Sequence, residues 1–432
     1  MHQRRTLRVL VGAQIFGGLG MGAGLAVGGL LAADLSGSTT LSGLSTTMIT
    51  LGAALFALPL AHLALRAGRR ISLGAGWLIA MTGAGLGVVA GVIGSFALLV
   101  IGMLLFGSGT ASNLQSRYAA TDLATPRTRA RSLAIVVWST SVGAIAGPNL
   151  TGAGATVADG LGLPVLTGPL VFAAAAFFAG GVLTLVALRP DPLLTSIRQA
   201  ADEVGADRAP PPPQSLRIVS AIRAMPAEGR LALLAIVLSH AVMVMVMTMT
   251  PVHLHHGGVA LSVVGLTISL HVAGMYALSP VAGWLADTIG RIPVIVLGQA
   301  ILAASLVVSG LAGHSEPVVM VGLVLLGLGW CCATVAGSTL LAESVAPPDR
   351  PRVQGTSDLL MNLMGASGGA TSGALLAIGG FSGLNLAAGL LIVPVLAMAL
   401  HVRATRRLES VSVLAGRDAP EEQAPPPGPP VT

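Results

Sequence analysis

The chain has 432 residues, of which 53% are hydrophobic and only 9% are charged, and its mean hydropathy is +0.84. Because a spanning helix needs about 20 mostly apolar residues, this composition supplies roughly eleven or twelve spans. It excludes a soluble enzyme, a disordered chain and a barrel of weakly alternating strands. The two cysteines, Cys331 and Cys332, are adjacent, which excludes a disulfide framework or a zinc site built on separated cysteine pairs.

The basic residues carry information about topology. The formal net charge is +6, and all 23 basic residues are arginines. They form clusters separated by arginine-free stretches, each long enough for an outward and a returning span. By the positive-inside rule every cluster is cytoplasmic, so both termini are cytoplasmic and the number of spans is even. We therefore expect a multi-pass protein of the cytoplasmic membrane, embedded in the lipid bilayer and without a nucleic-acid partner.

Apolar runs bounded by Gly, Pro and charge give the expected helices in chain order. They lie at about 9–33, 40–65, 71–92, 95–118, 131–153 and 165–188, and then at about 231–253, 260–286, 291–312, 317–341, 353–378 and 382–402. The sequence predicts an all-α membrane protein with twelve transmembrane helices in two six-helix bundles.

The punctuation of these runs predicts four regions. An N-terminal bundle at 1–188 is followed by a polar cytoplasmic linker at 189–230, which contains the stiff run Pro210–Pro213. A C-terminal bundle occupies 231–402. The remaining residues, 403–432, are expected to form a disordered cytoplasmic tail.

The two predicted bundles are copies of one module. A shift of 222 positions places Arg8 on Arg230, Gly68-Arg69 on Gly290-Arg291, and Pro126 on Pro348 without a gap. A parallel repeat of this kind is related by an axis along the membrane normal, as in secondary transporters that rock around a midplane site.

Two motifs carry a resemblance to a known family. Gly283–Arg291 resembles the loop motif of the major facilitator superfamily, although the repeated stretch Ala61–Arg69 departs from it, with Ala61 and Leu65 in place of Gly and Asp. Gly143–Pro148 is similar to a glycine-rich signature of antiporters in that superfamily. The resemblance implies two pseudo-symmetric bundles, transport by alternating access, and no enzymatic activity or cofactor.

Charged residues at the cytoplasmic ends are candidate latches between conformations. Asp287 is placed to cap the start of a helix in the other half, Arg291 to pair with Glu343, and Arg69 to pair with Asp122. An equally simple interpretation is that these residues only anchor the topology. The full candidate gating set is Asp287, Gly290, Arg291, Glu343, Arg69, Asp122, Gly147 and Pro148.

Soft ligands mark the expected midplane of the second half. Met243 and Met247 are one helical turn apart, as are His271 and Met275, so each pair shares a helix face. Thioether and imidazole together suit Cu(I). A methionine stripe also fills ordinary cores, and a buried His271 needs either a metal or a hydroxyl as its partner.

This pairing resembles the CcoA-type copper importers of the superfamily. The resemblance implies that Met243, Met247, His271 and Met275 are copper ligands, with copper as a transported substrate. Met21 is the repeat counterpart of Met243, and we expect it to complete the site in one conformation. Copper import by those proteins looks dependent on cysteine residues. This chain has only two cysteines, which are adjacent, and therefore departs from the pattern.

An outer-facing histidine cluster follows the methionines. It consists of His253, His255 and His256 within Pro251–Gly258. It is either a capture site for metal ions or a polar turn at the membrane surface.

A second function remains open because carboxylates are scarce deep inside the expected helices. The alternative is a facilitator or exporter of a small neutral or amphipathic organic compound, of the multidrug-efflux type. Its candidate binding groups are Gln14, Asn113, Gln115 and Thr334. In either case we expect a monomer that binds a small solute or a metal ion.

Overall fold

The computed structural model describes residues 2–38, 41–147, 150–204, 222, 225–257, 259, 261–313 and 315–417, and these residues form helices without a strand. The first half contains α1 (His2–Ser36), α2 (Ser42–Ile93), α3 (Phe96–Ala119), α4 (Arg129–Ala146), α5 (Leu150–Gly160), the short 3-10 helix η2 (Val165–Thr167) and α6 (Gly168–Ala187). The second half contains α9 (Ala227–His256), α10 (Leu261–Tyr276), α11 (Ser279–Ile289), α12 (Arg291–Leu311), α13 (Glu316–Glu343), the 3-10 helix η3 (Pro347–Asp349), α14 (Arg350–Leu390) and α15 (Ile392–Arg417).

The helices fit the expected number of spans. Nine helical segments of the described chain are long and apolar enough to cross a membrane. Two of them, α2 and α14, each contain a turn, at Gly68 and Gly380, where φ is +83° and +62°. Counting these as two spans each, and α4 with α5 as one more, is consistent with twelve.

The predicted repeat has a structural counterpart at the turns. Gly68 and Gly290, which the 222-residue shift superimposes, have φ values of +83° and +98°. Residues with a Cβ are strained in this region, whereas glycine is not. The same backbone reversal therefore begins the third span of each half.

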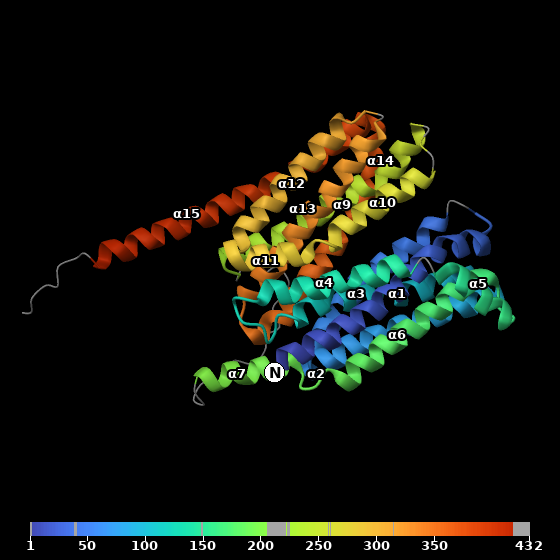
Figure 1. Cartoon of the computed structure of the whole chain (residues 1–432), viewed down its shortest axis with the longest axis horizontal. Coiled ribbons are helices and arrows are strands. Elements are labelled where there is room, and N and C mark those ends of the chain that lie inside the picture. The colour runs from blue at the N-terminus through green and yellow to red at the C-terminus, as the bar shows by residue number, and fades with distance from the viewer. Residues whose placement is uncertain are drawn as a thin grey trace, which may run out of the picture.

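The helices gather into two groups (Figure 1). Separate apolar clusters lie inside the first group and the second, and a third cluster contains residues of both, such as Leu133 of α4 and Ala282 of α11. One group is α1–α6 and the other is α9–α15. Glycines allow backbone-to-backbone contact within each group: a Cβ on Gly107 would meet the backbone of Ile49 and Ala53 in α2. Close approach through small residues is how helices associate in lipid.

The structure adds detail to three of the expected segments. The expected helix 260–286 is broken into α10 and α11, because Pro280 at the start of α11 has no N–H to continue the hydrogen-bond ladder. The expected linker contains a helix, α7 (Pro192–Val204). The expected disordered tail continues α15 to Arg417, since residues 404–417 are rich in the helix formers Ala, Arg and Leu. The four-region division itself stays a prediction.

Candidate functional site

The two bundles touch mainly along two helix pairs, α2 with α14 and α4 with α11. Both contacts use a glycine. A Cβ on Gly355 of α14 would lie 2.5 Å from the Cβ of Ala61, and a Cβ on Gly283 of α11 would lie 2.5 Å from that of Ala134. These contacts lie towards the arginine-rich end of the molecule, which we define by Arg69, Arg129, Arg291 and Arg350.

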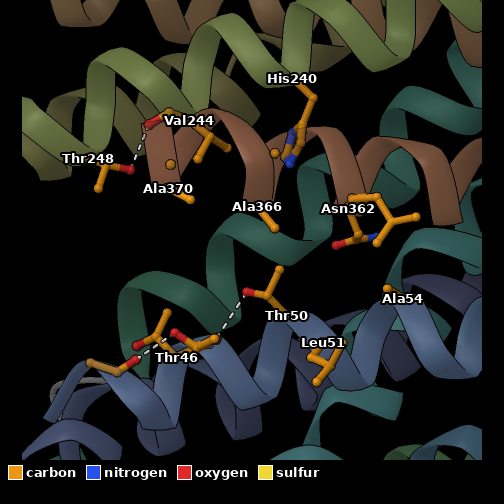
Figure 2. Close-up of a pocket in the computed structure, with 15 residues that line it drawn as sticks. Thr46, Thr50, Leu51, Ala54, His240, Val244, Thr248, Asn362, Ala366 and Ala370 are labelled. Carbon is orange, nitrogen blue, oxygen red and sulfur yellow. Dashed lines mark hydrogen bonds between the residues drawn. The ribbon is translucent and has the colours of Figure 1, made fainter. Parts of the chain in front are cut away.

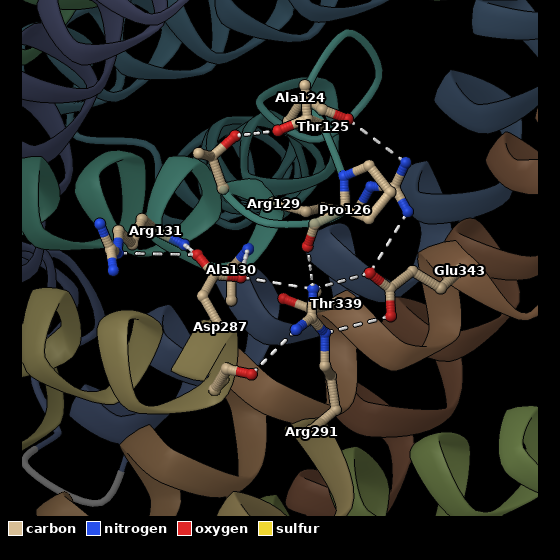
Figure 3. A network of polar contacts seen from close by, with 12 residues as sticks. Ala124, Thr125, Pro126, Arg129, Ala130, Arg131, Asp287, Arg291, Thr339 and Glu343 are labelled. Carbon is tan, nitrogen blue, oxygen red and sulfur yellow. Dashed lines mark hydrogen bonds and ion pairs between the residues drawn. The ribbon is translucent and has the colours of Figure 1, made fainter. Parts of the chain in front are cut away.

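Asp287 and the start of α4 form one polar contact across this end (Figure 3). The Asp287 carboxylate accepts hydrogen bonds from the backbone N–H groups of Ala130 and Arg131, at 3.1 and 3.0 Å. A carboxylate there satisfies orphan donors and complements the helix dipole. The structure therefore places Asp287 as a cap on a helix of the other half, as its position in the sequence predicts.

Arg291 and Glu343 form the centre of the same network. Arg291 Nη2 lies 2.9 Å from Glu343 Oε1, and Arg129 Nη1 of the other bundle lies 3.3 Å from that oxygen. Arg291 also donates to the backbone oxygen of Pro126 in the loop before α4. Gly290 begins this arrangement, because its positive φ turns the chain so that Arg291 follows directly.

The predicted partners Arg69 and Asp122 are also in contact. Arg69 Nε donates to Asp122 Oδ2 at 3.0 Å, and both side chains are buried. Arg69 donates as well to Gln354 of α14, which joins the two bundles. Burial raises the pKa of the Asp122 carboxyl from its ordinary value, and the adjacent Arg69 guanidinium opposes that rise.

A further buried ion pair was missed by sequence reasoning. Arg117 Nη2 in α3 lies 2.6 Å from Asp358 Oδ1 in α14, and the two side chains are 3% and 1% exposed. By the positive-inside rule, Arg117 is expected in a cytoplasmic cluster of arginines rather than in a buried ion pair. The partners are 241 residues apart and are not related by the repeat, so no spacing signal linked them. The pair ties the bundles together inside the membrane-spanning region.

A cavity of about 720 Å³ separates the bundles beyond this pair, on the side away from the arginine-rich end. Figure 2 shows its walls, formed by α2 on one side and by α9 and α14 on the other. None of the described residues that line it is charged. It consists of Gly43, Thr46, Thr47, Thr50, Leu51, Ala54, His240, Val244, Thr248, Asn362, Leu363, Gly365, Ala366, Gly369 and Ala370.

Two aromatic side chains, Trp330 and Tyr276, pack next to His240 of the cavity lining. Trp330 Nε1 donates a hydrogen bond to His240 Nδ1 at 3.1 Å, and Tyr276 packs edge-to-face on Trp330 with ring centroids 5.8 Å apart. Asn362, one turn beyond Asp358, donates to the Asp358 backbone oxygen at 2.7 Å. The cavity and the buried ion pair are thus connected through α14.

The residues of the predicted copper site are in two separate places. Met243 and Met275 are buried in the apolar core of the second bundle, and Met247 packs against it. Met21 packs against the core of the first bundle, so the structure does not bring it to the other methionines. None of these residues lines the described cavity.

His271 has a partner that the sequence analysis did not consider. It is fully buried, and its Nδ1 lies 2.8 Å from the backbone oxygen of Leu323 in α13. This contact arises because α10 and α13 pack tightly at Gly327, where a Cβ would meet the His271 backbone oxygen. Within the described part of the chain, His271 Nε2 has no hydrogen-bond partner, and no group of three or more His, Cys, Asp or Glu residues is arranged to hold a metal ion.

The remaining predicted site residues lie at the periphery. His253 stacks on Phe381, with ring centroids 4.2 Å apart, and its Nε2 lies 2.8 Å from the Gly313 oxygen. The side chains of His255 and His256 lie outside the described residues, as does Pro148. Gly147 ends α4 against α1, where a Cβ would lie 2.7 Å from the Cα of Gly22.

The sequence of the chain matches a known protein family over most of its length. The sequence profile described as Major Facilitator Superfamily matches residues 9–260 and 232–427. The chain belongs to the Major Facilitator Superfamily. It is therefore a multi-pass membrane transporter.

The chain is similar to two relatives in sequence and to one solved structure in fold. The chain is 40% identical to the uncharacterized MFS-type transporter YddS of Bacillus subtilis, with 91% of this chain and 90% of that protein aligned. It is 30% identical to the riboflavin transporter RfnT of Brucella anthropi, over 92% and 94% of the two chains. The human organic anion transporter MFSD10 has the same fold, with a TM-score of 0.71, 18% identity and coverage of 92% and 99%.

Proposed function

We propose that this transporter carries a small uncharged organic solute across the membrane by alternating access. The observation that carries the proposal is the uncharged cavity of about 720 Å³ between the bundles. Its lining combines apolar surface with hydroxyl, amide and imidazole groups, which is the composition of a site for a small organic molecule. A permanently charged solute would lose its hydration there without gaining a counter-charge.

One relative supports the same class of substrate. One relative, 30% identical over nearly the whole chain, is a riboflavin transporter. Riboflavin is an uncharged, partly apolar molecule with hydrogen-bonding groups. It is therefore the first compound to test, without being assigned as the substrate.

The arginine distribution supports an orientation. If the arginine-rich end is cytoplasmic by the positive-inside rule, both termini are cytoplasmic and the cavity opens towards the outside. The Asp287 cap on α4, the Arg129–Glu343 ion pair and the Arg69–Gln354 hydrogen bond, which all cross between the bundles, then close the cytoplasmic side. In this proposal they are latches that must separate when the transporter opens inwards. The transporter is expected to act as a monomer.

Copper transport has weaker support. The predicted ligands are divided between two apolar cores, and the one imidazole among them already contacts a backbone oxygen. None of them faces the described cavity. The methionines are accounted for as core residues, in which flexible thioethers fill irregular space.

The proposal is tested by transport measurements on purified full-length protein in proteoliposomes. Counterflow of riboflavin, a panel of uncharged polyols and heterocycles, and copper would be measured with the wild type and two variants. Ala366→Trp fills the cavity, whereas Ser367→Trp is a matched control, because Ser367 is exposed on the same helix outside the lining. We expect saturable counterflow of an uncharged solute that Ala366→Trp abolishes and Ser367→Trp preserves. Copper transport alone, or equal transport by both variants, would refute the proposal.

A further inference from the structure

The imidazole of His240 is held in one tautomer. The indole of Trp330 can only donate, and it donates to His240 Nδ1 at 3.1 Å. Nδ1 must therefore be the acceptor, so in the neutral ring the proton resides on Nε2. His240 lines the cavity from α9, and Figure 2 shows its ring directed away from α9 towards α14 and the cavity.

Gly365 keeps this part of the ring uncovered. A Cβ on Gly365 would lie 2.9 Å from His240 Nε2 and 2.8 Å from its Cδ2. Any larger residue would push the imidazole aside or cover it. The absence of a side chain at this position of α14 thus allows the Nε2–H to act as a donor for a molecule in the cavity.

The threonine hydroxyls in the cavity act as hydrogen-bond acceptors, in contrast to the N–H donor of His240. The hydroxyls of Thr47, Thr50 and Thr248 donate to backbone oxygens of their own helices, at 3.0, 3.0 and 2.6 Å. Each hydroxyl has one hydrogen and two lone pairs, so these groups offer only acceptors to a solute. The cavity therefore presents a ring N–H donor from α9, the amide of Asn362 from α14, and hydroxyl acceptors from α2 and the outer part of α9.

The wall between these groups is smooth. Gly365, Ala366, Gly369 and Ala370 lie on one face of α14, because residues three and four apart in a helix share a face. Leu51 of α2 lies on the opposite side of the cavity (Figure 2). A slot between small residues and an aliphatic side chain favours a flat ring system over a bulky one.

We propose that the cavity binds an uncharged, flat heterocycle whose carbonyl oxygen or ring nitrogen accepts from His240 Nε2–H, while its hydroxyl or N–H groups donate to the threonines. This inference rests on the proposed transport of an uncharged organic solute and specifies its chemistry. Trp330 is a positioning residue, because it acts by fixing the tautomer of His240.

The test uses full-length protein in proteoliposomes and two flavins as probes. Riboflavin carries a hydroxylated chain, and lumichrome has a related tricyclic ring system without it. His240→Met removes the donor and keeps a similar volume. His62→Met is the matched control, since His62 is an exposed histidine on α2 whose Nδ1 contacts its own helix at Leu58.

We expect His240→Met to raise KM for both flavins by about tenfold, the value of one hydrogen bond to a buried group, while kcat changes little. Trp330→Phe should raise both KM values by less, because the proton is then free to move to Nδ1. Thr50→Val should raise KM for riboflavin more than for lumichrome, because only riboflavin has a hydroxylated chain that can donate to Thr50. His62→Met should change neither.

Two outcomes would overturn the inference. One is an equal KM for wild type and His240→Met with both flavins. The other is saturable transport of an uncharged polyol by a protein that binds neither flavin, which would leave the proposed transport function intact. Failure to transport any uncharged solute would instead refute the function itself.

Discussion

The pair formed by α2 and α14 behaves differently at its two ends. Towards the arginine-rich end, Gly355 brings α14 against Ala57 and Ala61, and the buried Arg117–Asp358 ion pair and the Arg69–Gln354 hydrogen bond join the bundles. Towards the other end, the same two helices are separated by the cavity, whose described lining residues are all uncharged. One helix pair therefore forms both a tight contact between the bundles and a wall of the cavity.

The two ends of this helix pair use different chemistry. The closed end uses charge pairs and backbone caps, whose energies depend strongly on separation, together with glycine contacts. Such contacts are lost after a small movement of one bundle against the other. The cavity end uses neutral groups, which can release a solute without leaving a charge exposed to lipid.

Breaking the buried pair between Arg117 and Asp358 should have the largest effect. Arg117→Met leaves the Asp358 carboxylate buried without a counter-charge, which costs about 3–5 kcal/mol in comparable sites. We expect a large drop in thermal unfolding temperature, and partial recovery in the double variant Arg117→Met with Asp358→Leu. Unfolding followed in lipid-containing detergent would measure both. If the two single changes and the double change were simply additive, the pair would not act as a unit.

Widening the glycine contact should move the equilibrium between conformations. Gly355→Leu would press against Ala57 and Ala61, and overpacking of this kind costs about 1–3 kcal/mol. The strain falls on the conformation closed at the arginine-rich end, so spin-label distances across that end should lengthen. Gly373→Leu on the same helix is the control, since a Cβ there meets nothing within 4 Å. Equal distance distributions in both variants would contradict the proposed gate.

Removing one cap should have a smaller effect in the same direction. Asp287→Ala deletes the two acceptors at the start of α4, a loss of about 1 kcal/mol for a helix cap. Labelling of a cysteine introduced at Ala134, which packs against Gly283, should become faster. Asp34→Ala, an exposed carboxylate far from this end, should leave the labelling rate unchanged. A similar acceleration in both would assign the effect to overall charge.

The smallest effect is expected at Met21. Met21→Leu conserves volume in an apolar core, and such exchanges cost less than about 1.5 kcal/mol. Transport of riboflavin or of any other identified substrate should keep its wild-type KM and kcat, as measured by counterflow. Selective loss of copper transport in this variant would instead restore the metal hypothesis.

The sequence predicted the fold and the polar contacts at the arginine-rich end because both depend on local signals. Arginine clusters and apolar runs gave the spans, and the repeat aligned Gly68 with Gly290, which adopt the same unusual φ. Asp287, Arg291 and Glu343 could be paired because each lies next to the end of a span. In these cases position along the chain determines depth in the membrane.

The candidate binding site could not be predicted in the same way. Its lining combines α2, α9 and α14, and their relative rotation decides which residues face the cavity. The methionine spacing predicts that Met243 and Met247 share one face of their helix, but that face packs into the apolar core of the second bundle. His240, one turn before Val244, faces the cavity instead. Only the three-dimensional packing distinguishes these two faces, and it also brings Arg117 to Asp358.

The most direct test of alternating access measures both ends of the transporter in one preparation. Spin-label pairs at Thr47 with Ala370, across the cavity, and at Arg66 with Asp349, across the arginine-rich end, would be introduced after replacing the buried Cys331 and Cys332 by alanine. On adding a transported solute, we expect the first distance to shorten in the population in which the second lengthens. Shortening or lengthening of both distances together, or no change during active transport, would contradict the account.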